Sequence, residues 1–136
     1  MLIPALGIAK PKLEDKRLIK TAKSYLGTKY RLGGNTKKSI DCSGFTKAVF
    51  KKHGKNLPRT SYTQIKVGKK KLKKNAEVGD LIFFGDSKRY VGHVGIVVDP
   101  DKKLMIHASS ARGKVVISSY NTNYYNRKFR GIREVI

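Results

Sequence analysis

Two short apolar runs joined by a polar turn decide how the second half of the chain folds: GHVGIVVDPDKKLMIHA, residues 92–108. Both runs are rich in the β-branched and aliphatic residues that favour strands, and residues 99–101 between them are typical of a turn. We therefore predict an antiparallel hairpin. If its loop consists of residues 99–101, His93 lies directly opposite His107.

Such a pair of histidines has chemical potential. Directly opposed side chains on one face of a sheet have Cβ atoms about 4.5–5.5 Å apart, so the two imidazoles can form a hydrogen bond in which one orients the other. A slip of one residue would place the rings on opposite faces, so the prediction depends on the register. Two unrelated histidines, or a metal pair, are the alternatives. A metal site needs a third protein ligand, and the remaining histidine, His53, is predicted at the surface.

Outside the hairpin, the apolar pattern changes along the chain. Helical spacing occurs at residues 13–26, at residues 41–54 and in a short segment that ends near residue 65. Strand-like runs follow at residues 81–84, 115–117 and 131–136, and a helical turn is expected within residues 121–128. Helices first and strands later indicate the α+β class, with N-terminal helices packed on a C-terminal antiparallel β-sheet.

The second predicted helix begins with the sequence Asp41-Cys42-Ser43. Asp is a favoured N-cap, and the helix N-terminus that follows favours a thiolate at Cys42, as a cysteine nucleophile requires. The alternative is that a single cysteine is a small buried apolar residue. Together with His93 and His107, Cys42 supplies a nucleophile, a base and an orienting group.

Composition limits the remaining possibilities. The 136 residues suit one domain, and the formal charge of +22 predicts attraction to polyanions such as nucleic acid, anionic lipid or acidic cell-wall polymers. A solvated basic surface is the alternative. No aromatic and arginine pattern of an RNA-binding sheet is present, so we expect no specific nucleic-acid recognition. One cysteine excludes a disulfide scaffold, and no apolar run approaches the roughly 18 residues of a spanning helix.

We expect a leader at residues 1–12 and a single catalytic domain at residues 13–136. The apolar stretch in the leader is too short and wrongly flanked for a complete signal peptide. The protein is therefore either cytoplasmic, or its sequence begins after a removed export signal.

Six segments, in order, resemble the NlpC/P60 family of papain-like cysteine peptidases of bacterial cell walls. They are GTKYRLGG at 27–34, DCSGF at 41–45, LPRTSYTQ at 57–64, GDLIFF at 79–84, GHVGI at 92–96 and IHA at 106–108. The segment 116–127 further resembles the compact lipoprotein-type murein endopeptidases of Gram-negative bacteria. The resemblance implies the papain-like NlpC/P60 fold.

The resemblance also implies roles for individual residues. Cys42 matches the nucleophile, His93 the base and His107 the polar third member of the catalytic set. Tyr30 matches a tyrosine that lines the site and assists the oxyanion. The other matched positions are substrate-binding ones, with Asp41 and Ser43 at the free amine of a stem peptide and Arg59, Ser61 and Gln64 along the cleft. The structural alternatives are that Asp41 only caps its helix and that Arg59 and Gln64 only satisfy backbone groups.

The function implied is hydrolysis of a peptidoglycan stem peptide, at the D-alanyl–meso-diaminopimelate cross-link or at the γ-D-glutamyl bond to the diamino acid. No metal or organic cofactor is needed, and we expect a monomer in the cell envelope, periplasmic or secreted, with a lipid anchor compatible with the full precursor. The positive charge suits an anionic cell-wall or membrane surface. The alternatives are a thiol acyltransferase on the same fold, a basic nucleic-acid-binding domain and a non-catalytic wall-binding module.

Overall fold

The computed structural model describes residues 13–136, and the predicted leader at residues 1–12 lies outside them. The helices are α1 (Leu13–Lys23), α2 (Cys42–Lys51), α3 (Ser61–Gln64) and α4 (Asn123–Lys128), with a 3₁₀ turn, η1, at Lys73–Asn75. The strands are β1 (Lys29–Tyr30), β2 (Ser39–Ile40), β3 (Lys69–Lys71), β4 (Leu81–Phe84), β5 (His93–Asp99), β6 (Leu104–Ser109), β7 (Lys114–Ser119) and β8 (Phe129–Glu134).

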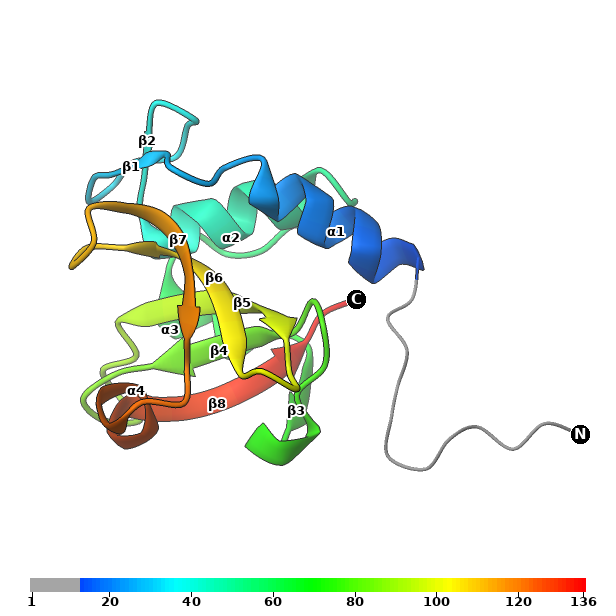
Figure 1. Ribbon diagram of the computed structural model, residues 1–136, viewed down its shortest axis with the longest axis vertical. Helices are drawn as coiled ribbons and strands as arrows, with labels where there is room; N and C mark the ends of the chain where they lie inside the picture. The colour runs from blue at the N-terminus through cyan, green and yellow to red at the C-terminus, as the bar shows by residue number, and fades with distance from the viewer. Residues whose placement is uncertain (1–12) are drawn as a thin grey trace, which may run out of the picture.

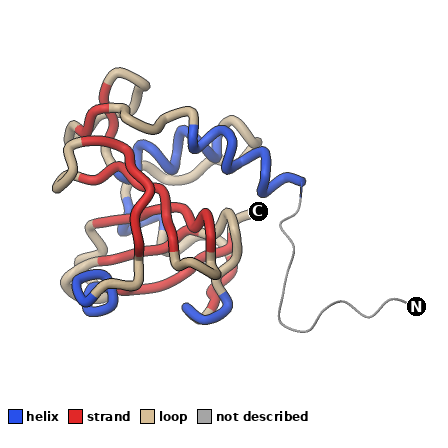
Figure 2. Tube along the Cα trace, viewed as in Figure 1, coloured by secondary structure: helices blue, strands red, loops and turns tan. Residues whose placement is uncertain are grey.

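These strands form one sheet in the order β2-β1-β7-β6-β5-β4-β8-β3. Strands β4 to β7 are an antiparallel meander, as predicted, and helices α1 and α2 lie side by side on one side of it (Figure 1; Figure 2). The α+β class, with the N-terminal helices packed on the sheet, is therefore confirmed. The last strand does not extend the meander, because β8 crosses over to pair with β4.

Both faces of the central strands are covered, which explains why β4 is apolar at every position. Leu81 and Phe83 point into the core beneath α1 and α2, whereas Ile82 and Phe84 point into a second core that includes Met105. Side chains alternate between the two faces of a strand, so a strand that is buried on both faces is a continuous apolar run.

Helix α2 holds the start of the site firmly. Its N-cap is Asp41, whose carboxylate accepts a hydrogen bond from the Gly44 amide at 2.7 Å, as the sequence predicts. The helix buries Phe45, Val49 and Phe50 against the sheet. Helix α1 is shorter than predicted, because it ends at Lys23 and the following residues form hydrogen-bonded turns.

The register of the β5–β6 hairpin differs by two residues from the one predicted. Ile96 pairs with Ile106, and an irregularity after Val97 accompanies a turn over residues 100–103. Gly95, and not His93, therefore lies opposite His107, and the prediction of directly opposed histidines is wrong. A shift of two residues keeps every side chain on its own face, so the histidines become diagonal neighbours that still meet.

Strand β3 was not predicted, because its three residues are all lysines. It pairs with β8, and Lys71 turns inward to form ion pairs with Asp80 at 2.6 Å, Glu77 at 2.8 Å and Glu134 at 3.3 Å. Burial alone would lower the pKa of Lys71, but these three carboxylates outweigh burial and raise it. Part of the basic charge is thus structural.

Candidate active site

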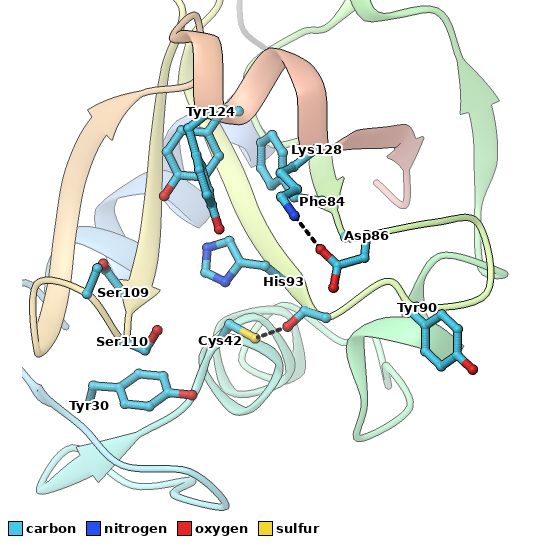
Figure 3. Close-up of a pocket in the computed structure, with 14 residues that line it drawn as sticks. Tyr30, Cys42, Phe84, Asp86, Tyr90, His93, Ser109, Ser110, Tyr124 and Lys128 are labelled. Carbon is cyan, nitrogen blue, oxygen red and sulfur yellow. Dashed lines mark hydrogen bonds and ion pairs between the residues drawn. The ribbon is translucent and has the colours of Figure 1, made fainter.

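The candidate nucleophile occupies the first position of α2. Cys42 is buried at 8% exposure, and its thiol points toward the Gly92 carbonyl oxygen, with Sγ and O 3.7 Å apart (Figure 3). The Gly92 carbonyl precedes β5, so the helix N-terminus and the start of this strand together fix the position of the sulfur.

The protonation of this thiol differs from the sequence-based expectation. Burial raises the pKa of the Cys42 thiol above its ordinary value, and the Asp41 carboxylate acts in the same direction. Backbone N–H groups, including those of Val94 and Ser43, lower the pKa but do not compensate. The prediction that the helix N-terminus provides a thiolate is therefore wrong, and the thiol is neutral at neutral pH.

Three polar side chains form a hydrogen-bonded chain across neighbouring strands. His93 Nε2 lies 2.7 Å from His107 Nδ1, and His107 Nε2 lies 2.7 Å from Ser118 Oγ. These residues come from β5, β6 and β7 respectively. The second imidazole is therefore held at both of its nitrogens, while Nδ1 is the ring nitrogen that the chain leaves available on His93.

Both imidazoles are neutral at neutral pH. Burial lowers the pKa of His93 to about 4. Burial also lowers the pKa of His107, to about 3, and the charges of His93 and Arg112 contribute in the same direction. Together with the protonated thiol, this gives a site whose nucleophile and base carry no charge before a substrate binds.

An aromatic side chain that the sequence reasoning missed packs against this pair. The ring centroid of Tyr125, on α4, lies 4.7 Å from that of Phe84, 6.0 Å from that of His107 and 6.5 Å from that of His93. The Tyr125 and His93 rings are 27° from parallel. Because these rings fill the space above the imidazoles, they restrict water and limit rotation of the His93 ring.

Cys42 and His93 line a pocket of about 620 Å³. Tyr30, Ser109 and Ser110 line one side of it, and Asp86, Tyr90 and Lys128 line the other (Figure 3). Cys42 and His93 lie between the two groups, so a chain lying across the pocket passes over the sulfur (Figure 3). This arrangement is suited to attack on a carbonyl carbon of an extended peptide.

The other predicted binding residues lie beside this pocket and are not among its lining residues. The Asp41 carboxylate accepts two hydrogen bonds from Arg59, each of 2.9 Å, and Arg59 also donates to Ser43 Oγ at 2.9 Å. Burial would raise the pKa of Asp41, but Arg59 and two backbone amides lower it. Gln64 is fully buried and bonds to Thr46, Ser43 and Pro58, and Ser61 Oγ donates to the Val91 carbonyl. Their roles in substrate binding stay predictions.

The sequence reasoning also missed Ser118, Asp86 and Lys128. Ser118 shares a face of β7 with Val116, which pairs with His107, so the period-two pattern of residues 114–119 was the signal that could have identified it. Tyr125, Asp86 and Lys128 gave no such signal, because they reach the pocket only through the crossover that brings α4 beside β4 and β5.

Other site types find less support within residues 13–136. No three His, Cys, Asp or Glu side chains cluster there as ligands for a metal ion. His53 lies away from the pocket and bonds through Nε2 to Thr21 Oγ1 at 2.8 Å. None of the helices in this range is both long and apolar enough to span a membrane.

Comparison with known proteins gives a consistent match. The NlpC/P60 family matches residues 27–134. Murein DD-endopeptidase MepS/Murein LD-carboxypeptidase of Escherichia coli (strain K12) is 39% identical over 123 residues, which are 88% of this chain and 62% of that protein. Gamma-D-glutamyl-L-lysine dipeptidyl-peptidase of Bacillus cereus is 36% identical over 131 residues, 95% of this chain and 38% of that protein. A crystal structure of an NlpC/P60 family protein from Bacillus cereus superposes with a TM-score of 0.83 and 36% identity, over 93% of this chain and 41% of that one.

Proposed function

The chain belongs to the NlpC/P60 family, and on that premise we propose that it is a cysteine peptidase that hydrolyses a bond in the stem peptides of bacterial peptidoglycan. One observation carries the proposal: Cys42 lies in an open pocket beside His93, which heads the hydrogen-bonded chain to His107 and Ser118. A thiol with an oriented imidazole is the arrangement that nucleophilic acyl transfer requires. The names of the Escherichia coli and Bacillus cereus relatives point to murein and to γ-D-glutamyl peptides as the substrate class.

The chemistry begins with proton transfer. His93 Nδ1 takes the thiol proton while Sγ of Cys42 attacks the carbonyl carbon, which forms a C–S bond and places the negative charge on the carbonyl oxygen. Backbone N–H groups at the start of α2, with the Tyr30 hydroxyl, stabilise this oxyanion. A donor of this kind is typically worth about 2.7–4 kcal/mol.

Collapse of the oxyanion breaks the C–N bond, and His93 gives its proton to the leaving amine. Water then attacks the thioester with His93 as the base, which releases the carboxylate product and returns the thiol to Cys42. His107 and Ser118 are positioning residues in this scheme.

The hydrogen-bonded chain determines which nitrogen of His93 can act. A base at Nδ1 must carry its own proton on Nε2, so His93 donates to His107 Nδ1. His107 then carries its proton on Nε2 and donates to Ser118 Oγ. When His93 becomes charged during the reaction, the neutral His107 accepts from it and stabilises the imidazolium.

The proposal includes the place where the enzyme acts. A stem-peptide hydrolase works in the cell envelope, and the formal charge of +22 holds this protein on an anionic wall or membrane surface as a monomer. Binding to isolated sacculi should weaken steeply as salt is raised. Binding that is insensitive to salt would contradict this part of the proposal.

The test is digestion of purified murein with the wild type and with the Cys42→Ala variant, followed by mass spectrometry of the fragments. Conversion of cross-linked dimers to monomers only by the wild type identifies the D-alanyl cross-link as the bond. Loss of everything after D-glutamate from uncross-linked stems identifies the γ-D-glutamyl bond. Acylated acceptors in place of free peptides would indicate a transferase, and identical digests with both proteins would refute the nucleophile.

A further inference from the structure

One side of the pocket carries a pair of opposite charges to which the catalytic steps assign no task. Asp86, in the loop after β4, and Lys128, at the end of α4, form an ion pair, and both line the pocket (Figure 3). The Lys128 ammonium also lies 5.9 Å from the centroid of the Tyr124 ring. Both partners remain accessible, since their side chains are 78% and 32% exposed.

The pocket differs in charge from the rest of the molecule. The whole chain carries a formal charge of +22, yet Asp86 and Lys128 are the two residues with full charges among those that line the pocket, and they cancel. A pocket that bound a polyanion would be expected to have an excess of basic side chains. A neutral pocket with one group of each sign is instead complementary to a ligand that itself carries one ammonium and one carboxylate.

We propose that Asp86 and Lys128 form a subsite for the zwitterionic amino-acid end of a diaminopimelate side chain. The ligand's ammonium replaces Lys128 at the Asp86 carboxylate, and the ligand's carboxylate binds the Lys128 ammonium. An exposed ion pair is itself worth little, so the exchange costs little. This subsite rests on the proposed stem-peptide hydrolysis.

The chemistry of the candidate substrates supports this assignment. In the D-alanyl cross-link, the residue before the D-alanine is a diaminopimelate whose side chain ends in a free ammonium and carboxylate. In the γ-D-glutamyl bond, the residue after the scissile bond has the same end when it is uncross-linked. Either bond therefore places a zwitterion within one residue of the Cys42 sulfur. An L-lysine stem has the ammonium alone, so Lys128 distinguishes the two kinds of stem.

The test uses synthetic stem peptides that carry the bond cut by the wild type and differ in the diamino acid, which is either meso-diaminopimelate or L-lysine. We expect the wild type to prefer diaminopimelate by about tenfold in kcat/KM, because a charge-assisted contact is lost with lysine. Lys128→Met should cleave both peptides at equal kcat/KM. Asp86→Asn should lower kcat/KM for both by about tenfold, through a higher KM.

The matched control is Lys88→Met, which removes an exposed positive charge of the same loop that does not line the pocket. This variant should keep the wild-type preference. Wild-type cleavage of both peptides at equal rates, unchanged in Lys128→Met, would overturn the subsite while the proposed function stands. Cleavage of neither peptide, nor of murein, by the wild type would overturn the proposed function itself.

Discussion

Replacing Gly95 with alanine tests whether close packing between β5 and β6 holds the imidazole pair in place. A Cβ atom at this position would lie 3.2 Å from His107 Cβ, 3.2 Å from the Ile106 carbonyl oxygen and 3.2 Å from Met105 Sδ. These contacts are a few tenths of an ångström too short, so a neighbour must move. The neighbours are backbone and buried side chains, and His107 cannot retreat without lengthening its 2.7 Å hydrogen bond to His93.

The magnitudes follow from this crowding. Overpacking of a core by one methyl group typically costs about 1–3 kcal/mol of unfolding free energy. Because a misplacement of about 1 Å can cost about a hundredfold in rate, a shift of a few tenths should lower kcat about tenfold, with KM less affected. Urea unfolding and steady-state kinetics measure the two quantities.

Gly92→Ala is the matched control for stability, because a Cβ at Gly92 meets nothing within 4 Å. This variant should unfold within about 0.5 kcal/mol of the wild type. Wild-type stability and wild-type kcat in Gly95→Ala would refute the reasoning, because they would show that the space opposite His107 does not constrain it.

Three further predictions concern protonation and the hydrogen-bonded chain. Since the pKa values of His93 and His107 fall to about 4 and about 3 on folding, the unfolded chain binds more protons below about pH 6.5; stability should therefore decrease by about 1.4 kcal/mol per pH unit per histidine between pH 6 and 4.5, and a flat urea midpoint would contradict this. Because burial raises the pKa of the Cys42 thiol, its alkylation by iodoacetamide should be slow at pH 7 and accelerate above pH 9, whereas a rate that is constant from pH 6 upward would indicate a preformed thiolate. Ser118→Ala should lower kcat about tenfold and shift the ¹⁵N signals of His107 toward a mixture of tautomers, with partial rescue in Ser118→Thr; unchanged signals would leave Ser118 without a positioning role.

The sequence predicted those features that depend on local rules. Asp41 caps α2 because a short acidic side chain before an apolar helix has few better uses, and Cys42 follows it of necessity. His93 and His107 share a face because the side-chain period of a strand is two, and this parity survived an error of two residues in the register.

The features that failed depend on contacts between distant elements. Lys71 becomes part of a strand only because Asp80 and Glu134 reach it from other segments. The protonated state of Cys42 follows from burial beneath β5, which no helix rule contains. Tyr125 lies against the histidines because β8 crosses over to β4 and positions α4 beside the pocket.

The most direct test of the central claim, that His93 activates Cys42 for attack on a stem-peptide carbonyl, is covalent trapping. A stem peptide with a chloromethyl ketone in place of its scissile bond is incubated with the wild type and with His93→Ala, and the rate of adduct formation is followed by intact-protein mass spectrometry. We predict one adduct per chain, located on Cys42, that forms at least a hundredfold more slowly in the variant. Equal rates in the two proteins, or an adduct on another residue, would contradict the claim.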